Sequence, residues 1–146
     1  MRSEISTWID APPDAVFPFV ADLARWPEFL PHYRYVRVLR REDGATLAAM
    51  SARRGIIPVS WHALQTHDRG SRRVHFRHVR GITRGMEVDW TLEPESGGTR
   101  ARILHELDLR WPWVGAWIAE HLISRRFIHP IATKTLARFK ALAEGK

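Results

Sequence analysis

Residues 74–112 constrain the fold more than any other stretch, because their polarity alternates from residue to residue. One parity is almost wholly apolar: Val74, Phe76, His78, Met86, Val88, Trp90, Leu92, Ala101, Ile103, His105 and Leu107. The opposite parity is mostly charged, and glycines separate the segments. Successive side chains on a strand point to opposite faces, so the pattern predicts antiparallel strands with one buried and one solvated face.

The remaining chain predicts a strand, two short helices, further strands and one long helix. Ser3–Asp10 alternates like a first strand, and short helices are expected up to Ala21 and over Leu23–Leu30, where Pro31 ends the second. Strands are expected over Tyr33–Glu42, Thr46–Arg54, Val59–His67, Arg72–Arg80, Gly85–Glu93 and Thr99–Arg110. Trp113–Glu144 has helical spacing, and Pro130 is expected to bend that helix.

These elements predict an α+β fold in one domain spanning residues 1–146. A one-sided sheet must be covered, and only one long helix is available to cover it. One helix over a wide curved sheet leaves space between the two layers. Because the inward parity is rich in tryptophan, phenylalanine and methionine, the space suggests a binding site for a hydrophobic small molecule.

Composition excludes several classes of protein. The chain has no cysteine, which rules out disulfides, thiolate metal sites and cysteine nucleophiles. No apolar run approaches the roughly 20 residues that span a bilayer, so no transmembrane segment is expected. The first residues lack the apolar core of a secretory signal, so we expect a cytoplasmic location. The absence of asparagine together with many charges is typical of heat-adapted proteins.

The net charge of +7 raises the question of an anionic partner. All but three of the 23 basic residues are arginine, and they are scattered along the strands rather than clustered. Tyr33, Tyr35 and Arg37 interleave aromatic and basic side chains, but they are expected to share a solvated face of the sheet. The sequence therefore disfavours nucleic acid as a partner.

Two histidines are the candidates for chemistry. By parity His78 and His105 point to the apolar face, where a histidine needs a hydrogen-bond partner. They could be core residues bonded to the backbone or lying at the cavity rim. Alternatively, they could make a polar contact with a ligand carbonyl or phenol, or act on it as a general acid or base. A register slip of one residue would turn both outward. No catalytic residue is assigned beyond these candidates.

Metal and cofactor sites have no support in the sequence. His75 and His78 lie three apart on a strand and face opposite ways. The eight histidines form no known zinc spacing, and the glycines of residues 81–85 join two strands rather than a strand and a helix. We therefore expect neither a metal nor a cofactor.

Local sequence and element order together resemble one superfamily over nearly the whole chain. The matching pieces include Ile9-Asp10-Ala11-Pro12-Pro13, Arg25-Trp26-Pro27-Glu28-Phe29-Leu30-Pro31, Gly85-Met86-Glu87-Val88-Asp89-Trp90, His105-Glu106 and Trp111-Pro112. They resemble the START and birch-pollen-allergen (SRPBCC) superfamily, in particular its bacterial polyketide cyclase/dehydrase and lipid transport branch. The resemblance implies a helix-grip fold, in which a seven-stranded antiparallel sheet wraps around a long C-terminal helix and leaves a cavity.

The resemblance also implies that the second short helix, with Trp26 and Phe29, lies over the cavity mouth. Parity and resemblance together predict these ligand-binding residues: Trp26, Phe29, Trp61, Phe76, His78, Met86, Trp90, Ile103, His105 and Trp117.

Three functions remain open at the level of sequence. The first is binding of a lipid, a quinone or a polycyclic aromatic or polyketide molecule. The second is a polyketide cyclase/aromatase in which His78 and His105 move protons, and the third is a basic regulator that binds a macromolecule. Convergence of polar groups in the cavity would favour the second, and a contiguous basic face would favour the third. The sequence leaves the identity of the ligand and the oligomeric state open.

Overall fold

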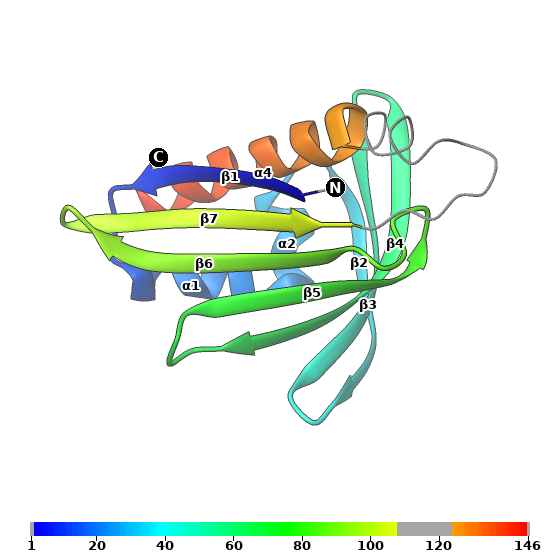
Figure 1. Cartoon of the computed structure of the whole chain (residues 1–146), viewed down its shortest axis with the longest axis horizontal. Coiled ribbons are helices and arrows are strands. Elements are labelled where there is room, and N and C mark those ends of the chain that lie inside the picture. Colours follow the sequence, from blue (N-terminus) through cyan, green and yellow to red (C-terminus); the bar gives the residue numbers. More distant parts are fainter. Residues whose placement is uncertain (1, 108–123, 146) are drawn as a thin grey trace.

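The computed structural model describes residues 2–107 and 124–145. A single antiparallel sheet curves around the C-terminal helix, and two short helices pack beside that helix (Figure 1). In chain order the elements are β1 (Arg2–Ile9), α1 (Pro13–Ala21), a 3₁₀ turn η1 (Leu23–Arg25), α2 (Trp26–Phe29), β2 (Tyr33–Glu42), β3 (Ala45–Arg54), β4 (Ile57–Asp68), β5 (Arg73–Gly81), β6 (Glu87–Glu95), β7 (Gly98–Glu106), a π-helical turn η2 (Ser124–Ile128) and α4 (His129–Ala143).

The sheet has seven strands in the order β1-β7-β6-β5-β4-β3-β2. Hairpins join β2 through β7, whereas β1 pairs with β7 and places Ile5 opposite Ile103. The seven-stranded helix-grip fold inferred from the sequence is thus confirmed. The start of the long helix, predicted near Trp113, lies outside the described residues.

The alternation predicted for the later strands is present. On β6, Val88, Trp90 and Leu92 are buried, whereas Glu87 is exposed and Asp89 is half-buried. His78 and His105 are 6% and 7% exposed, so both side chains point inward, as the alternation of polarity in the sequence predicted. Each inward row packs toward the helical layer, and apolar burial of this kind supplies the main stabilisation of the fold.

The expectation for β2 was wrong at one residue. A register shift separates Tyr33 from Tyr35 in the pairing with β3, so the simple alternation fails there. Tyr33 packs inward against Trp26, with ring centroids 5.4 Å apart. Tyr35 instead lies under the guanidinium of Arg37, whose Cζ is 4.6 Å from its ring centroid. Tyr33 therefore belongs to the interior and not to the solvated face.

Pro130 lies in the first turn of α4, where a missing backbone N–H costs little. The hydrogen bonding changes from π- to α-helical between Ile128 and His129, directly before this proline. The bend predicted at Pro130 stays a prediction, and what the structure shows there is this change of helix type. No helix within the described ranges is long and apolar enough to cross a membrane.

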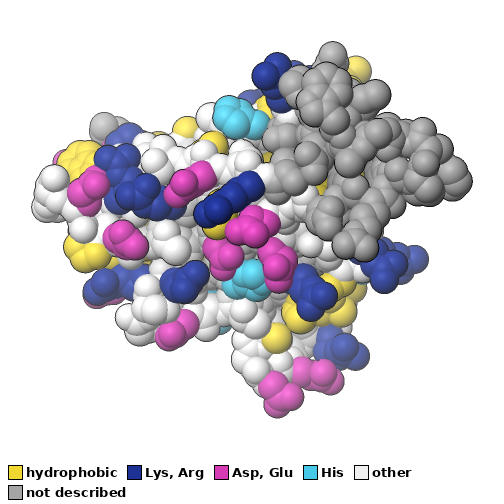
Figure 2. Space-filling model, viewed as in Figure 1, with side chains coloured by type: hydrophobic (Ala, Val, Ile, Leu, Met, Phe, Trp, Pro, Cys, Tyr) yellow, Lys and Arg dark blue, Asp and Glu magenta, His cyan; other side chains and the backbone are white. Residues whose placement is uncertain are grey.

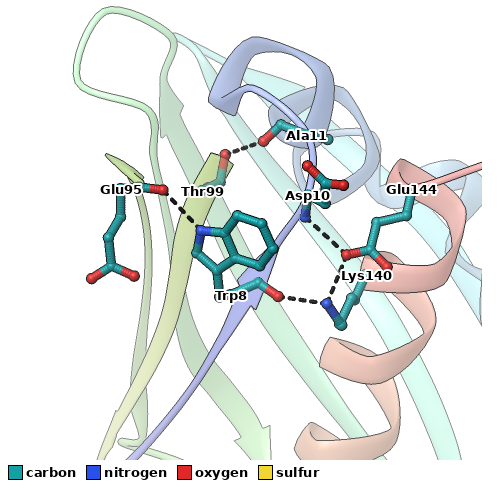
Figure 3. A network of polar contacts seen from close by, with 7 residues as sticks. All are labelled: Trp8, Asp10, Ala11, Glu95, Thr99, Lys140 and Glu144. Carbon is teal, nitrogen blue, oxygen red and sulfur yellow. Dashed lines mark hydrogen bonds and ion pairs between the residues drawn. The ribbon is translucent and has the colours of Figure 1, made fainter. Parts of the chain in front are cut away.

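A polar network fixes the last turn of α4 to the end of β1 (Figure 3). The Lys140 Nζ donates to the Trp8 carbonyl oxygen and to the Glu144 carboxylate, both at 2.7 Å. The same carboxylate accepts the Asp10 backbone N–H at 2.8 Å. Beside it, the Trp8 indole N–H donates to the Glu95 carbonyl oxygen at 2.8 Å. These bonds hold one end of the helix firmly against the sheet.

Candidate functional site

A cavity lies between the inner face of the sheet and the helical layer. The space open to water-sized molecules is about 80 Å³, and it is partly open to the surface. Its walls come from the inward rows of β3 to β7, from Trp26 and Tyr33, and from η2 and α4. The lining residues are Trp26, Tyr33, Met50, Val59, Trp61, Phe76, His78, Thr83, Met86, Val88, Trp90, Ile103, His105, Phe127, Ile128, Ile131, Ala132 and Thr135.

Trp26 is the central aromatic of the wall. Its ring lies 5.4 Å from that of Phe76 and 5.6 Å from that of Phe139 on α4, measured between centroids. The indole N–H donates to the Phe19 carbonyl oxygen at 3.2 Å, so the polar atom of this buried side chain is satisfied. Trp26 begins α2 and is followed by Pro27, a residue suited to the first turn of a helix. The short helix thereby positions a large apolar surface over the sheet.

His78 is held on both sides. Its ring stacks on Trp61 with centroids 5.4 Å apart and an interplanar angle of 4°. Its Nδ1 lies 2.7 Å from the Thr83 hydroxyl, because the turn after β5 folds Thr83 back over the strand. Burial, reinforced by nearby His105, lowers the pKa of His78 to about 3. His78 is therefore neutral at physiological pH and rigidly oriented.

His105 is the less constrained of the two histidines. Among the described residues, its ring has no hydrogen-bond partner. Burial, with a smaller contribution from His129, lowers the pKa of His105 to about 4. A neutral imidazole carries one N–H donor and one acceptor nitrogen. Within the described part of the chain, no protein group uses these two nitrogens, so both are available to hydrogen-bond a molecule in the cavity.

A third polar group enters from the helical side. The Thr135 hydroxyl donates to the Ile131 carbonyl oxygen at 2.8 Å, which leaves its oxygen to accept from the His32 Nε2–H at 2.9 Å. Burial lowers the pKa of His32, and nearby Lys134 lowers it further. Burial also raises the pKa of Tyr33, so its phenol keeps its proton. The cavity thus has polar groups on two walls, all of them uncharged.

Eight of the ten residues predicted for the site line the cavity: Trp26, Trp61, Phe76, His78, Met86, Trp90, Ile103 and His105. Phe29 does not, because it packs beside the cavity against Phe19, with ring centroids 5.2 Å apart. Trp117 lies outside the described residues. Whether the eight bind a ligand stays a prediction.

Several lining residues were missed for identifiable reasons. Tyr33 was assigned outward because the register shift is invisible in the sequence, and Thr83 lies in a turn where alternation gives no direction. Met50 and Val88 share the inward parity of their strands and could have been included. The positions on η2 and α4 follow helical spacing, but sequence alone did not show which part of the helix covers the cavity.

No group of three potential metal ligands occurs among residues 2–107 and 124–145. His75 contacts Asp89 at 2.8 Å and Glu87 at 3.6 Å, but this cluster lies on the outer face of β5 and β6. Among residues 2–107 and 124–145, the cavity wall contains no carboxylate. These residues offer a ligand apolar contact, aromatic contact and hydrogen bonds from neutral groups.

Comparison with known proteins places this chain in a family. The family model described as "Polyketide cyclase / dehydrase and lipid transport" matches residues 9–129. The chain is 30% identical over 105 residues to the granaticin polyketide synthase bifunctional cyclase/dehydratase of Streptomyces violaceoruber. The match covers 70% of this chain but only 32% of that relative, so the chain spans about a third of its length.

Solved structures agree on the fold. The Zhui aromatase/cyclase from Streptomyces sp. R1128 superposes with a TM-score of 0.87 at 16% identity, over 99% of this chain and 93% of that one. A START superfamily protein from Mycobacterium smegmatis superposes with a TM-score of 0.73 at 11% identity, over 97% and 98% of the two chains. At these identities the similarity establishes a common architecture.

Proposed function

Since this chain belongs to the polyketide cyclase/dehydrase and lipid transport family, we propose that it binds a flat aromatic molecule bearing carbonyl or hydroxyl oxygens. One observation carries the proposal: an aromatic cavity with two buried, neutral histidines on its wall. The rings of Trp26, Phe76 and Trp90 match a planar apolar ligand. The imidazoles of His78 and His105 match one or two oxygens at its edge.

The size of the cavity sets a condition on binding. About 80 Å³ holds only a few water molecules, less than a tricyclic ligand needs. Met50 and Met86 line the wall, and unbranched methionine side chains adapt to irregular shapes more readily than branched ones. Ligand entry is therefore expected to move these two methionines while the tryptophans keep their places.

Anthracene and anthraquinone test the proposal, because they share a shape and differ in the two carbonyl oxygens. Binding is measured by quenching of tryptophan fluorescence. Anthraquinone is expected to bind about fivefold more tightly for each hydrogen bond formed. The preference should fall in His78→Phe and His105→Phe, whereas His62→Phe on the outer face of β4 should retain it. Equal affinity of the wild-type protein for both molecules would contradict the proposal.

A cyclase is the second candidate, favoured by the convergence of His78, Thr83 and His105 on one cavity. In such an enzyme the wall would orient a chain of ketones for ring closure, and orientation alone accelerates reactions strongly. A histidine with a pKa of about 3 or 4 is a weak base at neutral pH, so the imidazoles are better suited to polarise carbonyls than to remove protons.

The cyclase candidate is tested by incubating the protein with a poly-β-ketone substrate and following aromatic products by chromatography. His78→Phe and His105→Phe should lose the product while still binding anthracene. The rate should show no inflection near the ordinary histidine pKa of 6.5. Normal turnover by both variants would exclude the histidines, and absence of turnover by the wild-type protein would leave ligand binding as the function.

A further inference from the structure

The turns at the cavity end of the sheet combine exposed isoleucines with arginines. This end is formed by the β3–β4 turn, at the upper right of Figure 1, and by the β5–β6 turn, lower down at its right. The two turns lie at the same end of neighbouring strands, and the β3–β4 hairpin projects further, because Gly81 at the end of β5 pairs with Trp61, four residues after Ile57. We call their outward residues the arginine–isoleucine rim: Arg53, Arg54, Ile56, Ile57, Ile82 and Arg84, all of them exposed.

Ile56 is the most unusual residue of the rim. It is 95% exposed, and it occupies the second position of a two-residue turn between Arg54 and Ile57. Gly55 fills the first position with φ +61, as such tight hairpins require. A turn this tight has no room to fold the isoleucine back on the sheet. Ile57 and Ile82 are 46% and 47% exposed, so each of the two turns carries an exposed isoleucine.

The charge of the rim has one sign. Residues 51–60 and 78–86 contain Arg53, Arg54, Arg80 and Arg84 and no aspartate or glutamate. Within the described ranges, no side chain of these four arginines has an ion pair or a hydrogen bond. The turns at the opposite end are mixed, since Glu42, Asp43, Asp68 and Glu95 lie in them or directly next to them. By the same measure the described part of the cavity end has one acidic residue, Glu87, the first of β6. Figure 2 shows the acidic side chains of this face over its middle and left and at its lower tip.

We propose that the arginine–isoleucine rim docks the cavity end of the protein onto an anionic phospholipid surface. Isoleucines that project from a hairpin tip can enter the boundary between headgroups and acyl chains, and unpaired arginines beside them can contact lipid phosphates. A deformable bilayer accommodates a protruding apolar tip, whereas a protein partner would need a matching pocket for Ile56. Val59 and Thr83, next to the two tips, line the cavity, so docking brings the cavity close to the membrane.

Cosedimentation with vesicles tests the proposal without any cavity ligand, so its outcome is independent of the proposed function. The wild-type protein should bind vesicles of phosphatidylcholine and phosphatidylglycerol mixed at about three to one, and not pure phosphatidylcholine. Arg53→Gln with Arg54→Gln should weaken binding about fivefold per arginine, hence roughly 25-fold together. Ile56→Ser should weaken it roughly tenfold, since the inserted side chain is lost.

Matched controls lie on β2. Arg40→Gln with Arg41→Gln removes the same charge away from the rim, and Leu39→Ser removes another exposed apolar side chain. Both controls should bind within about twofold of the wild-type protein, apart from the general effect of lower net charge. Equal loss in rim and control variants, or no sedimentation of the wild-type protein with anionic vesicles, overturns the proposal. If the wild-type protein does not sediment with anionic vesicles, the arginines of the rim fit an acidic protein surface instead.

Discussion

The two ends of the sheet are built for different tasks. At the far end, where the β6–β7 turn and the last turn of α4 meet β1, Lys140, Glu144 and Trp8 form a dense set of short hydrogen bonds. At the cavity end, neutral histidines, aromatic rings and two methionines surround open space, and the turns beyond carry arginines that have no ion pair within the described ranges. One end holds the helix in place, so the other can leave a gap between helix and sheet.

Packing around Trp90 should give the largest effect. Trp90 is 3% exposed, lines the cavity and contacts Phe139 with ring centroids 5.7 Å apart. Trp90→Ala should lower the free energy of unfolding by about 3–5 kcal/mol, measured by urea denaturation, because truncation enlarges the existing gap. Trp8→Phe at the far end should cost only about 1 kcal/mol, the value of its one indole hydrogen bond. Similar losses of unfolding free energy in Trp90→Ala and Trp8→Phe would contradict the difference proposed between the two ends of the sheet.

Acid should weaken the cavity end before the far end. The pKa values of His78 and His105 lie below the ordinary value of 6.5, so the unfolded chain takes up protons first as the pH falls. This stability is complete above 6.5 and is lost as the pH falls toward the folded-state values. On the order of 2 kcal/mol should be lost for each histidine between about pH 7 and about pH 5.

The pH dependence is measured by urea denaturation across that range. A variant carrying both His78→Phe and His105→Phe should have a much flatter profile of unfolding free energy against pH than the wild-type protein. A double variant that is as acid-sensitive as the wild-type protein would place the titrating groups elsewhere.

Loss of Lys140 should have the smallest of the three effects. Lys140→Met removes a bond to the Trp8 carbonyl oxygen and one of the partners of the Glu144 side chain, which is only 7% exposed. We expect a loss of about 2 kcal/mol in the free energy of unfolding and unchanged affinity for anthraquinone. The exposed Lys134 is the control, since Lys134→Met should change stability by less than about 0.5 kcal/mol. Weakened ligand binding in Lys140→Met would show that the two ends are coupled.

The strands after residue 73 were predictable because parity and glycine turns agree there, which located Trp90, Ile103 and both histidines correctly. The inward direction of the Tyr33 side chain was not predictable, because a register shift breaks the alternation of β2 at this residue. Nothing in the local composition indicates such a shift. Thr83 could not be assigned either, since its contact with His78 depends on the path of a turn. The network of Lys140 with Trp8 joins residues far apart in the chain, and such contacts follow from the fold rather than from any local pattern.

The pairing of β1 with β7 has a consequence for the order of events during synthesis. β1 lies at the edge of the sheet, and β7 is its one neighbour in the strand order. β1 leaves the ribosome before β7 and must therefore wait, with its backbone hydrogen bonds unmade, until β7 has been synthesised. Closing so long a loop delays folding, and an unpaired strand is prone to wrong contacts in the meantime. Truncation within β7 should consequently leave β1 without its partner, and we expect such chains to aggregate rather than to form a smaller sheet.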